Sequence, residues 1–122
     1  MGRTFDLPVG VASKLLGPWE LESLQERGGP PVLVSDSARV TADFRPDGRL
    51  QARAGYNQYN AIYRVDDGAL TLATRSTLMS RGAPPLDLKY ITLLEIATRW
   101  RSTVEGASLE LRSDAGTLRF RR

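Results

Sequence analysis

The chain has 122 residues, of which 41% are hydrophobic and 25% charged, a composition typical of one soluble globular domain. It contains no cysteine and no histidine, which excludes disulfides and thiolate chemistry and removes the commonest general base and the commonest ligands of zinc and iron. The net charge of +3 is carried almost entirely by arginine, whose planar fork suits phosphate and carboxylate. We therefore expect a non-enzymatic protein without a metal or cofactor.

The first 13 residues contain proline and glycine without a sustained hydrophobic period, so we expect an N-terminal extension at 1–13 and a single domain at 14–122. No apolar run is long enough to predict a transmembrane segment. The start also lacks the features of a secretory signal. Without cysteine, this favours the cytoplasm, although a trimmed exported protein fits the same observations.

Alternating hydrophobicity predicts strands for most of the remaining chain. A first strand begins near Leu15 and stops at the Gly28-Gly29-Pro30-Pro31 run, where proline removes backbone donors. Residues 40–54 then form a hairpin around the turn at 45–48, since proline and glycine occupy the positions that this turn favours. We expect three further hairpin turns, at 66–68, 105–106 and 114–116.

One segment departs from this pattern. After Pro84 and Pro85, apolar residues recur at helical spacing, which predicts an amphipathic helix at about 86–99. The predicted fold is α+β and sheet dominated: an antiparallel meander that forms a small, partly closed β-barrel, with one helix inserted before the last hairpin. Such a helix would cover a sheet face or plug the open end of the barrel.

Several short motifs occur in an order that resembles the META domain of the HslJ-like family. They are Leu16-Gly17-Pro18-Trp19, Phe44-Arg45-Pro46-Asp47-Gly48, Gly55-Tyr56-Asn57, Ser76-Thr77-Leu78-Met79 and a closing Leu118-Arg119-Phe120. The resemblance implies a small cracked barrel without an assigned reaction. It also implies an association with stress responses and the bacterial envelope.

The resemblance places cysteine in relatives at the positions of Tyr56 and Arg81. If these cysteines form a disulfide in exported relatives, their replacement suits a reducing compartment. We expect Tyr56 and Arg81 to be neighbours, with the guanidinium over the ring, a contact that contributes about 0.5–1 kcal/mol when exposed.

The candidate ligand or motif residues cluster near the junction at 54–63. Tyrosine rings there would line a cavity mouth or pack across the sheet, and the asparagine amides would bind a ligand or cap turns. The predicted set also includes a tryptophan expected in the core and one methionine; its members are Trp19, Tyr56, Asn57, Tyr59, Asn60, Tyr63 and Met79.

Arginines provide a second candidate site. Two of them alternate with buried positions in each of two predicted strands; they are Arg49, Arg53, Arg119 and Arg121. If the strands were adjacent, these side chains would form an anion-binding stripe, and if not, they form a solvated outer face.

The leading hypothesis is an interaction module of META type with a groove or cavity for an apolar small molecule or a protein segment. The alternative is an anion or nucleic-acid binder that uses the arginine-rich face, although the lack of interleaved exposed aromatics disfavours nucleic acid. A third reading is an accessory subunit whose exposed sheet edge pairs with a partner strand.

Overall fold

The computed structural model describes residues 14–35, 38–103 and 106–122, so the predicted extension at 1–13 and part of the turn at 105–106 lie outside the described residues. The elements are β1 (Gly17–Glu26), β2 (Pro31–Leu33), β3 (Val40–Phe44), β4 (Arg49–Ala54), β5 (Asn57–Asp66), β6 (Ala69–Leu78), α2 (Pro85–Glu95), β7 (Arg99–Ser102), β8 (Ser108–Ser113) and β9 (Gly116–Arg121). The fold is therefore sheet dominated with one long helix, as predicted.

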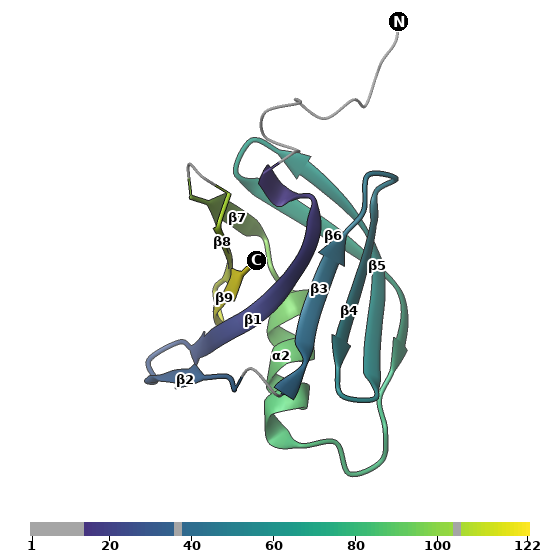
Figure 1. The fold of residues 1–122 in the computed structure, drawn as a ribbon, viewed down its shortest axis with the longest axis vertical. Helices are drawn as coiled ribbons and strands as arrows, with labels where there is room; N and C mark the ends of the chain where they lie inside the picture. The colour runs from purple at the N-terminus through teal and green to yellow at the C-terminus, as the bar shows by residue number, and fades with distance from the viewer. Residues whose placement is uncertain (1–13, 36–37, 104–105) are drawn as a thin grey trace, which may run out of the picture.

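The strands form one antiparallel sheet that closes on itself. Eight strands follow the order β1-β3-β4-β5-β6-β7-β8-β9, and β9 pairs with β1 to complete the barrel. Short β2 pairs with the second half of β1, beyond the part of β1 that pairs with β3. Figure 1 shows β1 curving across the molecule, with β3–β5 on one side of it and β7–β9 on the other.

The period-2 pattern decides which side chains face the interior. In β4, Leu50, Ala52 and Ala54 are buried and the residues between them are exposed. The core joins these to large side chains from several other elements, among them Trp19, Phe44, Tyr59, Tyr90 and Phe120. Burial of each such aromatic or aliphatic side chain contributes roughly 1.5–3 kcal/mol relative to leaving it exposed.

The helix is shorter than predicted, because residues that follow it join the sheet. Pro84 caps α2, whose first turn needs no donor from Pro85, and the Leu88 amide donates to the Pro84 carbonyl at 3.2 Å. After Glu95 the chain leaves the helix, and the Thr98 amide donates to the Arg112 carbonyl at 2.9 Å. The predicted end near 99 is therefore wrong, and Trp100 lies in β7.

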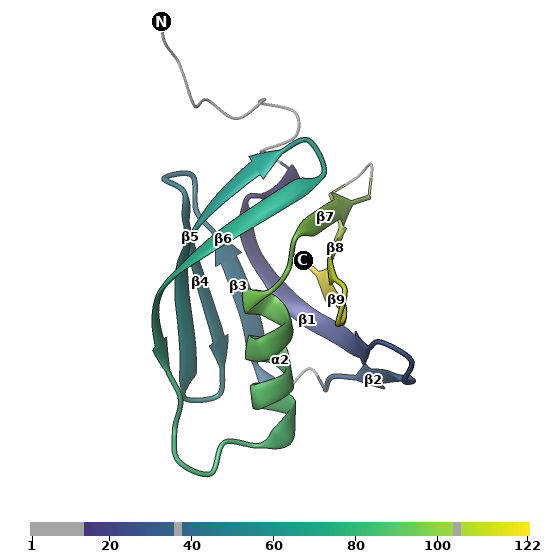
Figure 2. The same cartoon turned by 180° about the vertical axis from the view of Figure 1, so that it is seen from behind.

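Helix α2 covers the place where the barrel is least continuous. Seen from behind, it lies between β6 and the β7–β9 strands (Figure 2). The hydroxyl of Tyr90 donates to the Thr41 carbonyl at 2.7 Å, and its ring meets Phe120 edge to face at 6.2 Å. In the part of the chain that the structure describes, no helix is long and apolar enough to cross a membrane.

Candidate functional site

The Gly55-Tyr56-Asn57 turn holds the barrel wall to the start of the helix. Asn57 is 1% exposed, and its amide nitrogen donates to the Asp87 carboxylate at 2.7 Å and to the Ala54 carbonyl at 3.1 Å. Its amide oxygen accepts from the Ser80 amide at 2.6 Å and from the Ser80 hydroxyl at 2.9 Å. Because both ends of the Asn57 amide are bonded within the protein, this side chain ties β5 to α2.

The backbone conformation favours glycine at position 55. Its φ is +63°, which residues with a side chain rarely adopt. A Cβ atom there would lie 3.4 Å from the Asp87 carboxylate, an ordinary van der Waals contact, so space alone does not exclude a larger residue. The turn residues therefore serve the fold, which is the capping role predicted as one of the two readings for asparagine.

The three tyrosines of the junction do not form one cluster. Tyr56 is 90% exposed, whereas Tyr59 and Tyr63 are buried inside the barrel. The Tyr59 hydroxyl bonds with the Thr74 hydroxyl at 2.9 Å, and the Tyr63 hydroxyl donates to the Arg45 carbonyl at 2.6 Å. Burial raises the pKa of Tyr63 to about 12, with Asp47 and Asp43 adding to the shift. These two rings pack in the core and do not line a cavity mouth.

The expected contact between Tyr56 and Arg81 is absent. Both side chains are exposed, and within the described ranges the cation–π contact is made elsewhere, by Arg122 over Trp19 at 3.8 Å. The Trp19 indole also donates to the Leu15 carbonyl at 2.8 Å, so this tryptophan is a core residue as predicted. The expectation for Tyr56 and Arg81 was wrong because exposed side chains at neighbouring loops have no packing that fixes them together.

The remaining motif residues are structural or peripheral. Asn60 donates to the Ser76 hydroxyl at 3.1 Å on the outer face of β5 and β6. Met79 is partly buried and packs against the core. Neither residue lines the pocket over β7–β9 or the pocket between the β1–β2 and β8–β9 turns.

The arginine stripe does not form, because its two strands are not neighbours. Strand β4, with Arg49 and Arg53, pairs with β3 and β5, whereas β9, with Arg119 and Arg121, pairs with β8 and β1. Arg49 lies 3.5 Å from Asp47 and Arg119 lies 3.1 Å from Glu110. The four side chains therefore face outward, as predicted, but on separate parts of the barrel.

The most open feature of the barrel is the second half of β6. This strand pairs with β5 from Ala69 to Leu78, but with β7 only through the pair Ala69 and Arg99. We call residues 71–78 of this strand the β6 edge. Except for Leu72, which is half-buried, these side chains are exposed, and Leu78 is 61% exposed.

Backbone geometry shows which groups the β6 edge presents. The Leu70 amide donates toward β7, to the Thr98 carbonyl at 2.8 Å. Because amides alternate in direction along a strand, those of Leu72 and Thr74 face the same side, where β7 no longer pairs. Sequence reasoning missed these two residues. The hydrophobic pattern of β6 predicts which of its side chains are buried, but it does not predict where the pairing with β7 ends.

Comparisons with known proteins agree with this architecture. A protein from Burkholderia xenovorans solved by NMR has a TM-score of 0.72 and 21% identity, over 100% of this chain and 93% of that chain. A DUF4847 family protein from Bacteroides vulgatus has a TM-score of 0.64 and 13% identity, over 86% and 91% of the two chains. A lipocalin-like protein from Bacteroides uniformis has a TM-score of 0.62 and 18% identity, over 89% and 98%.

These identities show a shared fold alone. The search of curated proteins found no match. The META domain family model matches residues 13–122, which is nearly the whole chain and includes every described strand. The motif order in the sequence, the small barrel with its helix and this match agree, and the chain belongs to the META domain family.

Proposed function

We propose that this META domain is a non-enzymatic interaction module that binds an extended protein segment as an added strand along the β6 edge. The observation that carries the proposal is the unequal pairing of β6. One side of the strand bonds to β5 along its length, while the other side pairs with β7 at a single position. Unpaired strand edges of this kind recruit extended segments through main-chain hydrogen bonds.

The side chains of the β6 edge restrict which segments can pair with it. An extra residue, Arg75, interrupts the register between β5 and β6, and bulges and charges are the devices by which proteins limit uncontrolled edge pairing. Thr71 and Thr77 offer hydroxyls along the strand, whereas the Thr74 hydroxyl bonds to Tyr59. The exposed Leu78 at the end of the strand offers an apolar contact. A partner segment would therefore need backbone complementarity and an apolar residue near one end.

An interior site for an apolar small molecule has less support. Large side chains already occupy the middle of the barrel, since Trp19, Tyr59 and Tyr90 are at most 1% exposed. Two pockets lie on the outside of the barrel, one over β7–β9 and one between the β1–β2 and β8–β9 turns. A protein segment on the outer edge needs no rearrangement of this core.

The non-enzymatic part of the proposal rests on residue chemistry. Histidine and cysteine are missing from the sequence, and among the described residues no three carboxylates come together as a metal site. In the described part of the chain, the buried polar side chains outside the tyrosines and tryptophans are Ser23, Asn57 and Asp87, and the last two are bonded to each other. We extend the proposal to a stress-related or envelope-related process, an association of META domain relatives that a deletion strain would test.

Hydrogen exchange on the full chain tests the geometry first. We expect the amides of Leu72 and Thr74 to exchange at least about 100-fold faster than those of Thr71 and Ala73, which face β5. Peptides of about 12 residues, selected from a random library on the immobilised protein, then provide probes. A peptide that binds as proposed will slow exchange at Leu72 and Thr74.

Two variants of one residue separate strand addition from other modes of binding. Thr74→Pro removes the outward amide, and we expect it to weaken selected peptides at least about tenfold. Like Thr74→Pro, Thr74→Ala removes the hydroxyl contact to Tyr59, but it keeps the backbone amide. The affinity of Thr74→Ala for the selected peptides should therefore match that of the wild type. Peptides that bind Thr74→Pro as tightly as the wild type, or that protect other strands, would contradict the proposal.

A further inference from the structure

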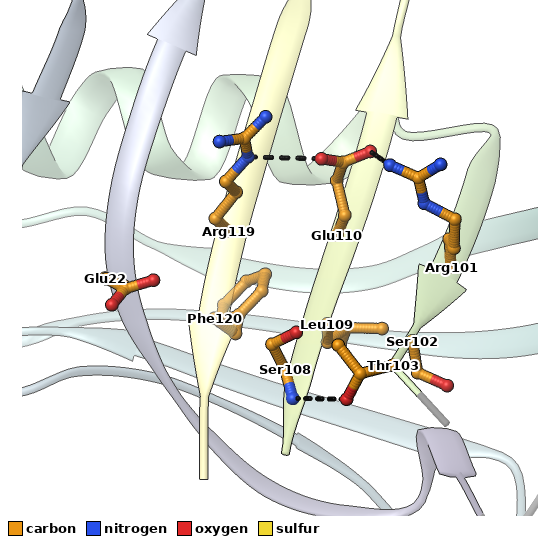
Figure 3. Close-up of a pocket in the computed structure, with 9 residues that line it drawn as sticks. All are labelled: Glu22, Arg101, Ser102, Thr103, Ser108, Leu109, Glu110, Arg119 and Phe120. Carbon is orange, nitrogen blue, oxygen red and sulfur yellow. Dashed lines mark hydrogen bonds and ion pairs between the residues drawn. The ribbon is translucent and has the colours of Figure 1, made fainter. Parts of the chain in front are cut away.

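A second surface lies on the outside of β7, β8 and β9, away from the β6 edge. It is an open groove of about 630 Å³ lined by Glu22, Arg101, Ser102, Thr103, Ser108, Leu109, Glu110, Arg119 and Phe120. Charged side chains cross it as a row from neighbouring strands, as Figure 3 shows. The row follows from register, since Arg101 pairs with Glu110 and Glu110 with Arg119.

Glu110 is the centre of this row. Its side chain is 12% exposed, and its carboxylate lies 3.2 Å from Arg101, 3.7 Å from Arg112 and 3.1 Å from Arg119. One carboxylate therefore contacts three guanidinium groups, each of which carries five N–H donors. Most of those N–H donors do not bond to Glu110.

The way the arginines approach Glu110 leaves their outer ends available. Arg112 and Arg119 both contact the carboxylate through Nε, so the edge of each guanidinium group that carries its two terminal amino groups is not the edge that faces Glu110. Their side chains are each 59% exposed. Glu110 thus positions the guanidinium groups and leaves their paired terminal donors directed at solvent.

The charge of the groove also favours an anion. Arg99 stands directly opposite Arg112 in the sheet, and like charges in that position are destabilising unless a counter-charge is present. The charged residues of the lining balance, with Arg101 and Arg119 against Glu22 and Glu110, and the excess positive charge comes from Arg112 and Arg99 beside the groove. Hydroxyls of Ser102, Thr103 and Ser108 border the groove and can donate to further oxygens.

We infer that this β7–β9 groove binds an acidic protein segment through Arg101 and Arg119, which line it, and Arg112, which lies beside it, with Glu110 as their positioning residue. The groove is open and crosses several strands, which suits a chain with spaced carboxylates better than a small enclosed anion. Exposed aromatic rings on which bases could stack are missing from its lining, which disfavours single-stranded nucleic acid. The inference does not depend on the β6 edge, because different strands form the two surfaces.

Fluorescence anisotropy with a labelled peptide of six glutamates alternating with glycine tests the inference. We expect binding at low ionic strength that weakens as salt is raised and that is lost when glutamine replaces glutamate in the peptide. Arg112→Gln and Arg119→Gln should each weaken it at least about fivefold. The matched control is Arg53→Gln on exposed β4, which changes net charge equally and should alter affinity less than about twofold.

The affinity of the Glu110→Gln variant for the peptide tests whether the cluster binds the peptide or only stabilises the fold. The substitution removes one negative charge while keeping an acceptor oxygen, so we expect the glutamate peptide to bind about threefold tighter. Weaker binding by Glu110→Gln, an equal loss with Arg53→Gln, or no binding at low salt would overturn the inference. An oligothymidylate of matched charge that binds more tightly than the peptide would overturn the assignment to an acidic protein segment.

Discussion

Two seams of the barrel are joined in different ways. The β1–β9 seam is a continuous ladder in which residues from Glu20 to Glu26 pair with Arg121 to Gly116 across one bulge. The β6–β7 seam has one pair, and α2 fills the space beyond it. The comparison shows that one seam is joined by main-chain pairing along its length, whereas at the other the strands part after one pair and α2 lies beside the opening, bonded to β5 through Asp87 and to β3 through Tyr90.

The consequences for function differ as well. A closed ladder uses its backbone donors and acceptors internally, so the β1–β9 seam offers a partner only side chains. The β6–β7 seam keeps the amides of Leu72 and Thr74 facing outward, because the helix contributes packing and no strand partner. The side with the weaker strand pairing is therefore the side on which an added strand fits.

The largest expected effect is at the closed seam. A Cβ at Gly116 would collide with the backbone carbonyl of Gln25 on the facing strand, so Gly116→Val should lower the free energy of unfolding by about 3 kcal/mol or more. Urea denaturation followed by tryptophan fluorescence measures it. At Gly29 a Cβ meets its nearest atom at 3.5 Å, so Gly29→Ala should change stability little. If the free energy of unfolding fell equally in both variants, the close approach of β9 to β1 would not be the cause of the loss at Gly116.

The next effect concerns the side-chain link at the open seam. Asn57→Ala leaves the Ser80 amide and the Asp87 carboxylate without their shared partner, which should cost about 2–3 kcal/mol. The half-buried Asn60 has one hydrogen bond, to a hydroxyl, and Asn60→Ala should cost about 0.5 kcal/mol. Thermal unfolding compares the two variants. A small effect at Asn57 would mean that packing of α2 alone holds the seam.

A third effect tests how the helix is attached to the opposite wall. Tyr90→Phe removes the hydrogen bond to the Thr41 carbonyl and should cost about 1 kcal/mol at neutral pH. Burial raises the pKa of Tyr90 far above 10.0 and that of Tyr63 to about 12, so folding favours the neutral phenols. Their contribution is complete below pH 10 and is lost as the pH rises through the folded pKa.

Unfolding free energies between pH 8 and pH 12 check this sign. We expect the wild type to lose stability above about pH 10, and Tyr90→Phe to lose less over the same range. A parallel decline in the two proteins would contradict the role of Tyr90.

The smallest effect is at the barrel end next to the closed seam. Arg122 stacks on Trp19 at 3.8 Å and donates to the Leu16 carbonyl at 2.7 Å. Arg122→Met keeps an apolar stem over the ring and should lose about 0.5–1 kcal/mol. The control Arg81→Met removes an exposed arginine that has no such contact. A shift of tryptophan emission together with the loss would confirm that Trp19 reports this end of the barrel.

Local patterns were sufficient to predict most of the elements. Alternation in 40–44 and 49–54, joined by proline and glycine at 46 and 48, predicted a hairpin that the structure confirms. The helical spacing after Pro84 predicted α2, but its end was wrong, because residues from Thr98 onward pair with β8 and tertiary pairing overrides helical periodicity. Short β2 was missed, since three exposed residues carry no period.

The candidate sites were less predictable than the strands. Sequence alone determined the absence of histidine and cysteine, the outward direction of Arg49, Arg53 and Arg119, and the family motifs. Only the tertiary structure decided that β4 and β9 are separated, that Asn57 is a buried link, and that three arginines share Glu110. Periodicity fixes which face a side chain takes, whereas strand order, which depends on packing across the whole chain, decides which side chains meet.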